Sequence, residues 1–289
     1  MKTRIITAAV GIALLAGVVF CPWPAVLAVL LAALAALAVW ELLHNTGRVK
    51  IPVLVGGSMA FAALEVLLCY GVQCARLTET AAGPIWWRPL FAALRTGHVI
   101  EILALVYLAL LVLVLLRYHE TADVQVIGYA AFATVYAATG FAALGMLWAI
   151  AGLAGFLLAL VIPWMSDTGA YFVGVFFGRH KMTPVISPKK TWEGFVGGIV
   201  VSALSAWGYM AICRALQVSL PFSEVRLILA TLVLAPLSVC GDLFASVIKR
   251  QSGIKDYGKI MPGHGGIMDR FDSVLVIAPL LCSFWILHG

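Results

Sequence analysis

The sequence predicts an all-α polytopic integral membrane protein, and its composition and the spacing of its apolar runs both support this fold class. Of its 289 residues, 63% are hydrophobic and only 11% are charged, whereas about a quarter of a soluble domain is charged. Mean hydropathy is +1.05. Most apolar runs approach the roughly 17–25 residues that a helix needs to cross a bilayer. Because lipid offers the backbone no hydrogen-bond partners, we expect these runs to be helices. They fall at about 5–21, 25–43, 51–72, 99–116, 125–178, 194–213, 227–248 and 271–287.

The number of crossings depends on the run at 125–178, which is too long for one helix. Basic residues favour the cytoplasmic side of a membrane. With two helices in this run, all five groups of basic residues fall on that side. These groups are Lys2 and Arg4, Arg48 and Lys50, Arg117, residues 179–190 and residues 249–270. We therefore predict about nine transmembrane helices, with the N-terminus in the cytoplasm. Arg214 and Arg226 would be external, as would the segment 73–98, whose tryptophan pair predicts an interfacial piece.

The net charge of +6 favours anionic partners. Without a soluble basic domain no nucleic acid is expected, which leaves membrane lipids and substrates that carry phosphate. The six cysteines are scattered without a CxxC pair, so neither a zinc site nor a disulfide framework is predicted.

Charged side chains concentrate in the second half of the chain. Only one of the six aspartates lies in the first 165 residues, and eleven of the nineteen Lys and Arg residues follow them. We therefore predict two parts. Residues 1–157 form transmembrane helices that serve as a lipid-facing scaffold. Residues 158–289 form a catalytic transmembrane region with cytoplasmic loops at 179–192 and 249–269.

The first polar cluster surrounds Asp167, which stands in an apolar run. Tyr171 and Gly174 follow about one and two helical turns later, so the three residues share a face. Glycine on that face lets another helix come close. Because an unpaired charge in a membrane is costly, two interpretations have equal weight: Asp167 contacts metal or substrate, or it is hydrogen-bonded to a neighbouring helix.

The second cluster, Ser187-Pro-Lys-Lys-Thr-Trp-Glu-Gly194, joins two apolar runs. Pro188 is expected to end regular structure, and Thr191 is expected to cap the next helix. A helix N-terminus with Lys189 and Lys190 beside it favours a phosphate. The alternative is an ordinary basic loop on the cytoplasmic side.

The third cluster begins inside the apolar run at 227–248. Polar side chains recur there at helical spacing and form a stripe that leads to the membrane surface. A glycine-rich loop follows, and such loops let backbone N–H groups approach an anion closely. The stripe and the loop together contain Asp242, Ser246, Lys249, Arg250, Lys255, Asp256 and His264.

Asp269 and Asp272 open the last apolar run, where they share one helical face. Mg2+ bound with phosphates typically takes one or two carboxylates plus water. With Asp242, these residues predict a Mg2+ site, and a second metal ion is an alternative arrangement. The simpler interpretation, that the two aspartates only cap the helix, leaves Asp242 and Arg270 unexplained. His264 is either a phosphate donor or proton carrier, or a residue that shapes the loop.

These clusters resemble the motifs of the phosphatidate cytidylyltransferases (CDP-diacylglycerol synthases). One position departs mildly, since Met261 stands where the family usually has Leu, Ile or Phe. The resemblance is firm over 160–289 and rests only on length and hydropathy over 1–160. The shared segments are Asp167-Thr-Gly-Ala-Tyr171, Ser187-Pro-Lys-Lys-Thr-Trp-Glu-Gly194 and Ser246-x-x-Lys249-Arg250-x4-Lys255-Asp256-x-Gly258-x2-Met261-Pro262-x-His264-Gly265-Gly266-Ile267-x-Asp269-Arg270-Phe271-Asp272.

The resemblance implies a Mg2+-dependent enzyme that transfers a cytidylyl group from CTP to phosphatidate, giving CDP-diacylglycerol and pyrophosphate in phospholipid biosynthesis. We expect a multi-pass protein of the cell inner membrane with its active site facing the cytoplasm, the side that the charge count favours. We expect Asp242, Asp269 and Asp272 to hold the metal, with Asp167 in support. The expected catalytic residues are Asp269, Lys249 and Arg270. The expected substrate-binding residues are Ser187, Lys189, Lys190, Ser246, Arg250, Lys255, Asp256 and His264.

Two rival functions remain. One is a membrane transferase or kinase that acts on an isoprenoid alcohol, which could share the hydropathy and the aspartate clusters. The other is a secondary transporter with Asp167 and Asp242 as ion sites, which predicts an inverted repeat that the sequence does not show. The sequence leaves open whether the chain forms a homodimer. It also leaves open the roles of Glu41, Glu65 and Glu101, which lie in or beside apolar runs where a carboxylate is a functional candidate.

Overall fold

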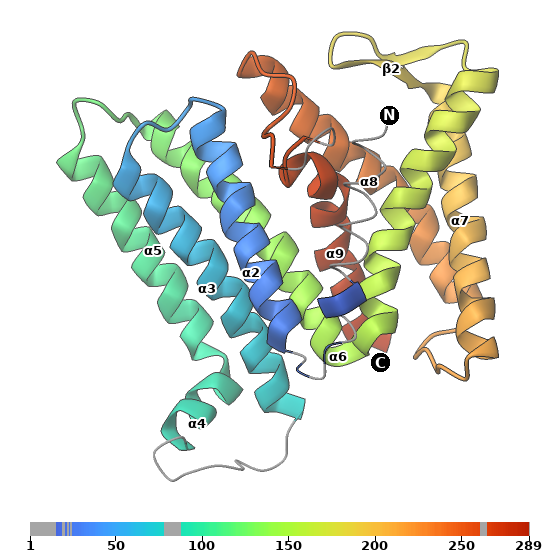
Figure 1. Cartoon of the computed structure of the whole chain (residues 1–289), viewed down its shortest axis with the longest axis horizontal. Helices are drawn as coiled ribbons and strands as arrows, with labels where there is room; N and C mark the ends of the chain where they lie inside the picture. Colours follow the sequence, from blue (N-terminus) through green and yellow to red (C-terminus); the bar gives the residue numbers. More distant parts are fainter. Residues whose placement is uncertain are drawn as a thin grey trace. The chain divides into compact units, whose positions relative to one another are not determined.

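The computed structural model describes residues 16–18, 21, 23, 25–77, 88–260 and 265–288, and it confirms the all-α membrane fold class (Figure 1). Within the described part, seven helices are long and apolar enough to cross a membrane. The predicted nine crossings and the cytoplasmic N-terminus stay predictions, because most of the first apolar run lies outside the described residues. The spanning helices are α2 (Ala25–Trp40) with the π-helical extension η1 (Glu41–Asn45), α3 (Pro52–Leu77), α5 (His98–Arg117), α6 (Val124–Phe177), α7 (Trp192–Ala215), α8 (Glu224–Gln251) and α9 (Met268–His288).

Helix α6 consists of two helical parts joined at a glycine. Its 54 residues would extend about 80 Å at 1.5 Å per residue, more than twice the thickness of a bilayer core. Gly152 interrupts the helix with φ 58° and ψ −149°, a conformation that is essentially restricted to glycine. The run at 125–178 therefore holds two helices, as the basic connectors predicted.

The chain packs into two compact units, the first made of residues 1–150 and 256–269 and the second of residues 151–255 and 270–289. The segment 256–269, which belongs to a predicted catalytic loop, thus packs with the first unit. The division predicted at 157/158 separates scaffold from catalytic residues rather than packing units, and it stays a prediction.

In the first unit, helices α2, α3, α5 and the first part of α6 lie side by side (Figure 1). A short helix, α4 (Arg88–Thr96), connects α3 to α5 within the segment predicted to be interfacial. Helix α2 packs through small side chains, since its alanines at 28, 32, 35 and 38 are all buried. Small residues allow helix backbones to approach closely in a membrane, so this face of α2 suits close packing against its neighbours.

In the second unit, the second part of α6 meets α7 through glycines. A Cβ atom at Gly194 would lie 2.6 Å from the Ala170 carbonyl oxygen and 3.2 Å from Gly174 Cα. The predicted close approach at Gly174 is therefore confirmed, and the helix that approaches it is α7. Thr191 caps α7 as predicted, because its Oγ1 accepts a hydrogen bond from Gly194 N at 3.1 Å.

A two-stranded antiparallel hairpin precedes α7. Strands β1 (Lys181–Thr183) and β2 (Ser187–Thr191) pair with Lys181 opposite Thr191. The prediction that Pro188 ends regular structure is wrong, since Pro188 lies within β2. A proline can occupy such a strand because each strand of a two-stranded ribbon has an outer edge on which no N–H donor is needed.

The crossing of α6 and α7 can be tested with one alanine. Gly194→Ala should lower the thermal unfolding midpoint in detergent by several degrees, because overpacking a close contact typically costs about 1–3 kcal/mol. Gly208→Ala is the matched control on the same helix, since no atom lies within 4 Å of a Cβ at Gly208. Equal midpoints for the two variants would contradict the crossing.

Candidate active site

A close crossing of α8 and α9 builds the centre of the second unit. A Cβ atom at Gly241 would lie 2.6 Å from the carbonyl oxygen of Asp272 and 3.2 Å from Ser273 Cα. The absence of a side chain at Gly241 therefore lets the backbones meet. Asp242, the next residue on α8, is consequently held beside the first turns of α9, and its carboxylate interacts electrostatically with Asp272.

Three aspartates from three helices form an acidic cluster, defined here as Asp167 on α6, Asp242 on α8 and Asp272 on α9. Asp272 is only 8% exposed. The Ser273 backbone N–H donates to Asp272 Oδ1 at 2.7 Å, and Ser273 Oγ donates to Asp167 Oδ2 at 3.4 Å. Ser273 therefore joins two members of the cluster. Its only sequence signal was a hydroxyl next to an aspartate in an apolar run.

The hairpin brings a cation to this cluster. Lys190 on β2 places Nζ 2.7 Å from Asp242 Oδ2. Lys249 also interacts electrostatically with Asp272. Of the predicted residues, the structure thus brings together Asp167, Lys190, Asp242, Lys249 and Asp272.

The donor chemistry of the acidic cluster fits a Mg2+ ion. Like charges held together in an apolar region repel strongly unless a cation offsets them, and carboxylate oxygens are ligands that Mg2+ prefers. Among the described residues, no group of three or more His, Cys, Asp or Glu side chains could hold a metal ion. A cage of three aspartates is therefore not preformed there. One or two carboxylates are enough for a Mg2+ ion that also binds water and phosphate.

Asp269, predicted as a metal ligand, has its described partners in the first unit. Its Oδ2 accepts hydrogen bonds from Tyr257 N at 2.8 Å and Gly266 N at 2.9 Å. Gly265 has φ +85°, and a Cβ there would lie 2.7 Å from the same oxygen, so this position requires glycine. Asp269 thus organises the backbone of the loop, and its role as a metal ligand stays a prediction.

Other contacts hold the hairpin at the start of α7. Glu193 accepts hydrogen bonds from Arg179 N at 3.1 Å and from His180 Nδ1 at 2.6 Å. Arg250 Nε donates to the Ile186 carbonyl oxygen at 3.4 Å, which ties α8 to the turn between the strands. Glu193 therefore anchors the segment that leads into the hairpin. Its position in the first turn of α7 gave no sign of this role.

The remaining predicted residues differ in exposure. Ser187 and Ser246 are half-buried in the second unit. His264 lies outside the described residues. The exposed residues are Lys189, Lys255, Asp256 and Arg270.

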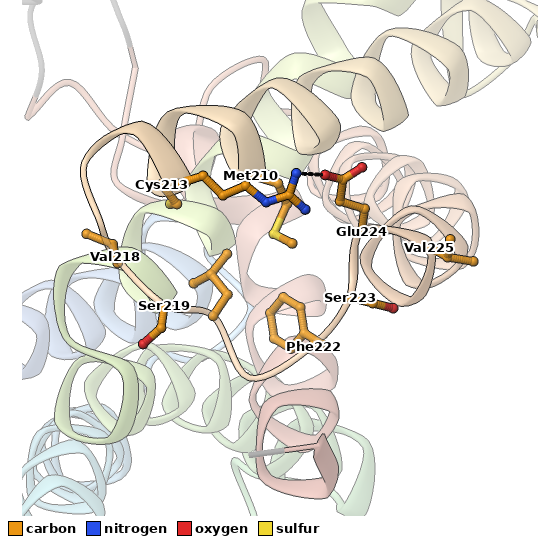
Figure 2. Close-up of a pocket in the computed structure, with 10 residues that line it drawn as sticks. Met210, Cys213, Val218, Ser219, Phe222, Ser223, Glu224 and Val225 are labelled. Carbon is orange, nitrogen blue, oxygen red and sulfur yellow. Dashed lines mark ion pairs between the residues drawn. The ribbon is translucent and has the colours of Figure 1, made fainter.

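A pocket of about 490 Å3 lies in the second unit (Figure 2). It is lined by the end of α7, the start of α8 and their connector, and the ion pair between Arg214 and Glu224 forms part of its wall. The 24 residues of α7 separate this end from Thr191 by about 36 Å. This separation exceeds the roughly 30 Å thickness of a bilayer core, so the pocket and the acidic cluster belong to opposite ends of the spanning helices.

Comparison with known proteins identifies the family. The model of the cytidylyltransferase family matches residues 2–288. The chain belongs to the cytidylyltransferase family. A Staphylococcus epidermidis (strain ATCC 35984) protein named phosphatidate cytidylyltransferase is 48% identical over 130 residues, which cover 45% of this chain and 48% of the relative. Proteins of the same name from Bacillus subtilis (strain 168) and Staphylococcus aureus (strain COL) are each 45% identical over 130 residues, or 45% of this chain. These residues cover 46% and 48% of the two relatives.

The chain spans about half the length of the curated relatives that it matches. The family match nevertheless extends over nearly the whole chain. The resemblance predicted from the motifs is therefore confirmed at the level of the family, including the half in which the sequence offered only length and hydropathy.

The pairing of Lys190 with Asp242 predicts a specific pattern of stability. Lys190→Met should destabilise the protein by roughly 1–3 kcal/mol, between the values typical of exposed and buried pairs, because it leaves the acidic cluster without this cation. Adding Asp242→Asn should restore part of the loss. Thermal unfolding in detergent measures both effects, with Lys189→Met as the exposed control. A double variant no more stable than Lys190→Met would contradict the pairing.

Proposed function

We propose that this protein transfers a cytidylyl group from CTP to phosphatidate, giving CDP-diacylglycerol and pyrophosphate in phospholipid biosynthesis. Membership of the cytidylyltransferase family and relatives named phosphatidate cytidylyltransferase at 44–48% identity support this activity. The observation that carries the proposal is the acidic cluster beside a lysine-bearing hairpin. A reaction between two phosphate-bearing substrates needs both carboxylates for a metal ion and cations for the phosphates.

The chemistry requires no nucleophilic side chain. An oxygen of the phosphatidate phosphate attacks the α-phosphorus of CTP and forms a new P–O bond. The bond between the α-phosphorus and the oxygen that bridges to the β-phosphate breaks, and pyrophosphate leaves with that electron pair. The protein contributes by aligning two anions and by offsetting the charge that gathers around the α-phosphorus.

Contacts of the cationic side chains in the second unit support this proposal. Lys190 and Arg250 connect the hairpin to the acidic cluster and to α8. These two residues, with Lys249, would offset charge on the triphosphate and on the departing pyrophosphate. Ser187 would donate a hydrogen bond to a phosphate oxygen. The exposed Lys189, Lys255 and Arg270 would add to the positive field that attracts both substrates.

Asp242 and Asp272 would hold Mg2+, with Asp167 in support. When bound, the metal ion supplies charge neutralisation at the phosphate oxygens. The Asp242 carboxylate also pairs with Lys190. Asp269 would act through the loop whose backbone it binds.

We expect the two substrates to reach the site by separate routes. Phosphatidate is a bilayer lipid, and its acyl chains would enter sideways between helices. CTP would arrive from the cytosol at the surface on which the hairpin lies. We infer that the protein is a multi-pass protein of the cell inner membrane with its active site facing the cytoplasm, as the positive-inside rule favours.

Replacement of one carboxylate tests the proposal. Asp242→Asn should lower the formation of CDP-diacylglycerol from phosphatidate and labelled CTP at least a hundredfold, because it removes both a metal ligand and the partner of Lys190. Asp123→Asn is the matched control. Asp123 Oδ1 accepts from Val126 N at 2.8 Å at the start of α6, and asparagine caps a helix equally well. Full activity of purified Asp242→Asn would refute the assignment of the site.

A further inference from the structure

Glu41, in the first unit, is a fully buried carboxylate whose described partners lie in residues 256–260 and 265–268, called here the signature loop. It is 0% exposed and lies on η1, at the end of α2. Its Oε1 accepts from Ile267 N at 3.0 Å and its Oε2 from Met268 N at 2.8 Å. These N–H groups stand at the start of α9, where a helix leaves donors without intrahelical partners and where negative charge is favoured.

The signature loop is shaped to admit this carboxylate. A Cβ atom at Gly258 or at Gly266 would collide with the carboxylate of Glu41. Asn45, which lies one turn after Glu41, donates from Nδ2 to the Tyr257 carbonyl oxygen at 2.8 Å. Both described ends of the loop are therefore attached to η1, and two glycines of the family motif are explained by the approach of Glu41.

Asp269 is bound by the same loop backbone that Glu41 and Asn45 hold. The two N–H groups that bind Asp269 Oδ2 come from Tyr257 and Gly266. Tyr257 is held by Asn45, and Gly266 directly precedes the two residues that are held by Glu41. The position of the Asp269 carboxylate therefore depends on the backbone that Glu41 and Asn45 hold.

The support under Glu41 is itself braced. The Leu42 carbonyl oxygen accepts from Thr46 Oγ1 at 2.6 Å and from Tyr129 Oη at 2.8 Å. The Arg48 guanidinium lies 5.1 Å from the centre of the Tyr129 ring. Single π-helical turns of this kind are frequent at functional sites. A residue that orients others is effective only if its own position is fixed in this way.

We propose that Glu41 is a positioning residue for cytidylyl transfer: its carboxylate sets the conformation of the signature loop and, through the loop, the orientation of Asp269. This inference rests on the proposed function. Glu41 is too deeply buried to touch a substrate, so it acts through the backbone. A glutamine would fill the same space, but its NH2 group would face an N–H donor in place of an acceptor oxygen.

Amide hydrogen exchange of the full-length protein in detergent tests the contact without reference to catalysis. Glu41→Gln should raise exchange in residues 256–260 and 265–268 at least tenfold and leave α3 unchanged. Glu65→Gln is the matched control, since Glu65 is a half-buried carboxyl group of the same unit on α3. Exchange in these residues that is equal in wild type and Glu41→Gln would overturn the proposal.

Steady-state kinetics distinguish positioning from general stability. In Glu41→Gln we expect kcat to fall about a hundredfold, since small misplacements of reacting groups have effects of this size, and the KM for CTP to rise several-fold. A purely structural role would reduce only the amount of folded enzyme, so an unchanged KM for CTP would overturn the proposal.

Asn45→Ala provides a second test if Glu41→Gln does not fold, because it removes only the bond to Tyr257. We expect faster exchange around Tyr257 and a higher KM for CTP, and wild-type values for both would overturn the inference. If the wild-type protein makes no CDP-lipid, the proposed function fails. A difference in exchange confined to Glu41→Gln would then still support the contact between Glu41 and the loop.

Discussion

A carboxylate in a membrane-spanning chain must find a donor or a cation, and the structure of this protein depends on how that requirement is met. The cost of an uncompensated charge in an apolar region is several kcal/mol. In the first unit, Glu41 and Asp269 accept hydrogen bonds from backbone N–H groups. In the second unit, Asp242 is paired with Lys190, and Asp272 accepts from Ser273 N. Each pairing joins two segments of the chain or fixes the local backbone.

Close helix crossings bring the charged residues of the second unit together. Glycines at 174, 194 and 241 let backbones meet where ordinary side chains would hold them apart. Aspartates on three helices thereby reach one region, and the hairpin adds a lysine to it. The acidic cluster is consequently a product of helix packing rather than of one local motif. Its residues lie far apart in the sequence, between Asp167 and Asp272.

Features that depend on local chemistry could be predicted from the sequence. The helices follow from hydropathy because lipid leaves the backbone no alternative, and the cap at Thr191 follows from the side chain next to the helix start. The hairpin could not be predicted in this way, because Pro188 reads as a breaker until the pairing of β2 with β1 is known. Asp242 and Asp272 could be singled out as candidates from the sequence, because a carboxylate in or beside an apolar run is costly. The pairing of Lys190 with Asp242 could not be predicted, because it depends on packing.

The signature loop shows most clearly that contacts between distant segments cannot be predicted from one sequence. Its glycines predicted a backbone that approaches an anion, and that physical inference is sound. At Tyr257, Gly266, Ile267 and Met268, however, the anions are the protein's own carboxylates. The partner of Ile267 lies 226 residues away in the sequence, a separation across which one sequence gives no pairing signal. The half predicted to be scaffold therefore contributes directly to the conformation of the motif.

The fate of each CTP phosphate decides whether the proposed cytidylyl transfer to phosphatidate takes place. Purified protein would be incubated with phosphatidate, Mg2+ and CTP labelled either at the α- or at the γ-phosphate. We expect the α-label to enter the lipid and the γ-label to leave in pyrophosphate. Transfer of the γ-label to a lipid would show a kinase and would refute the proposed cytidylyl transfer.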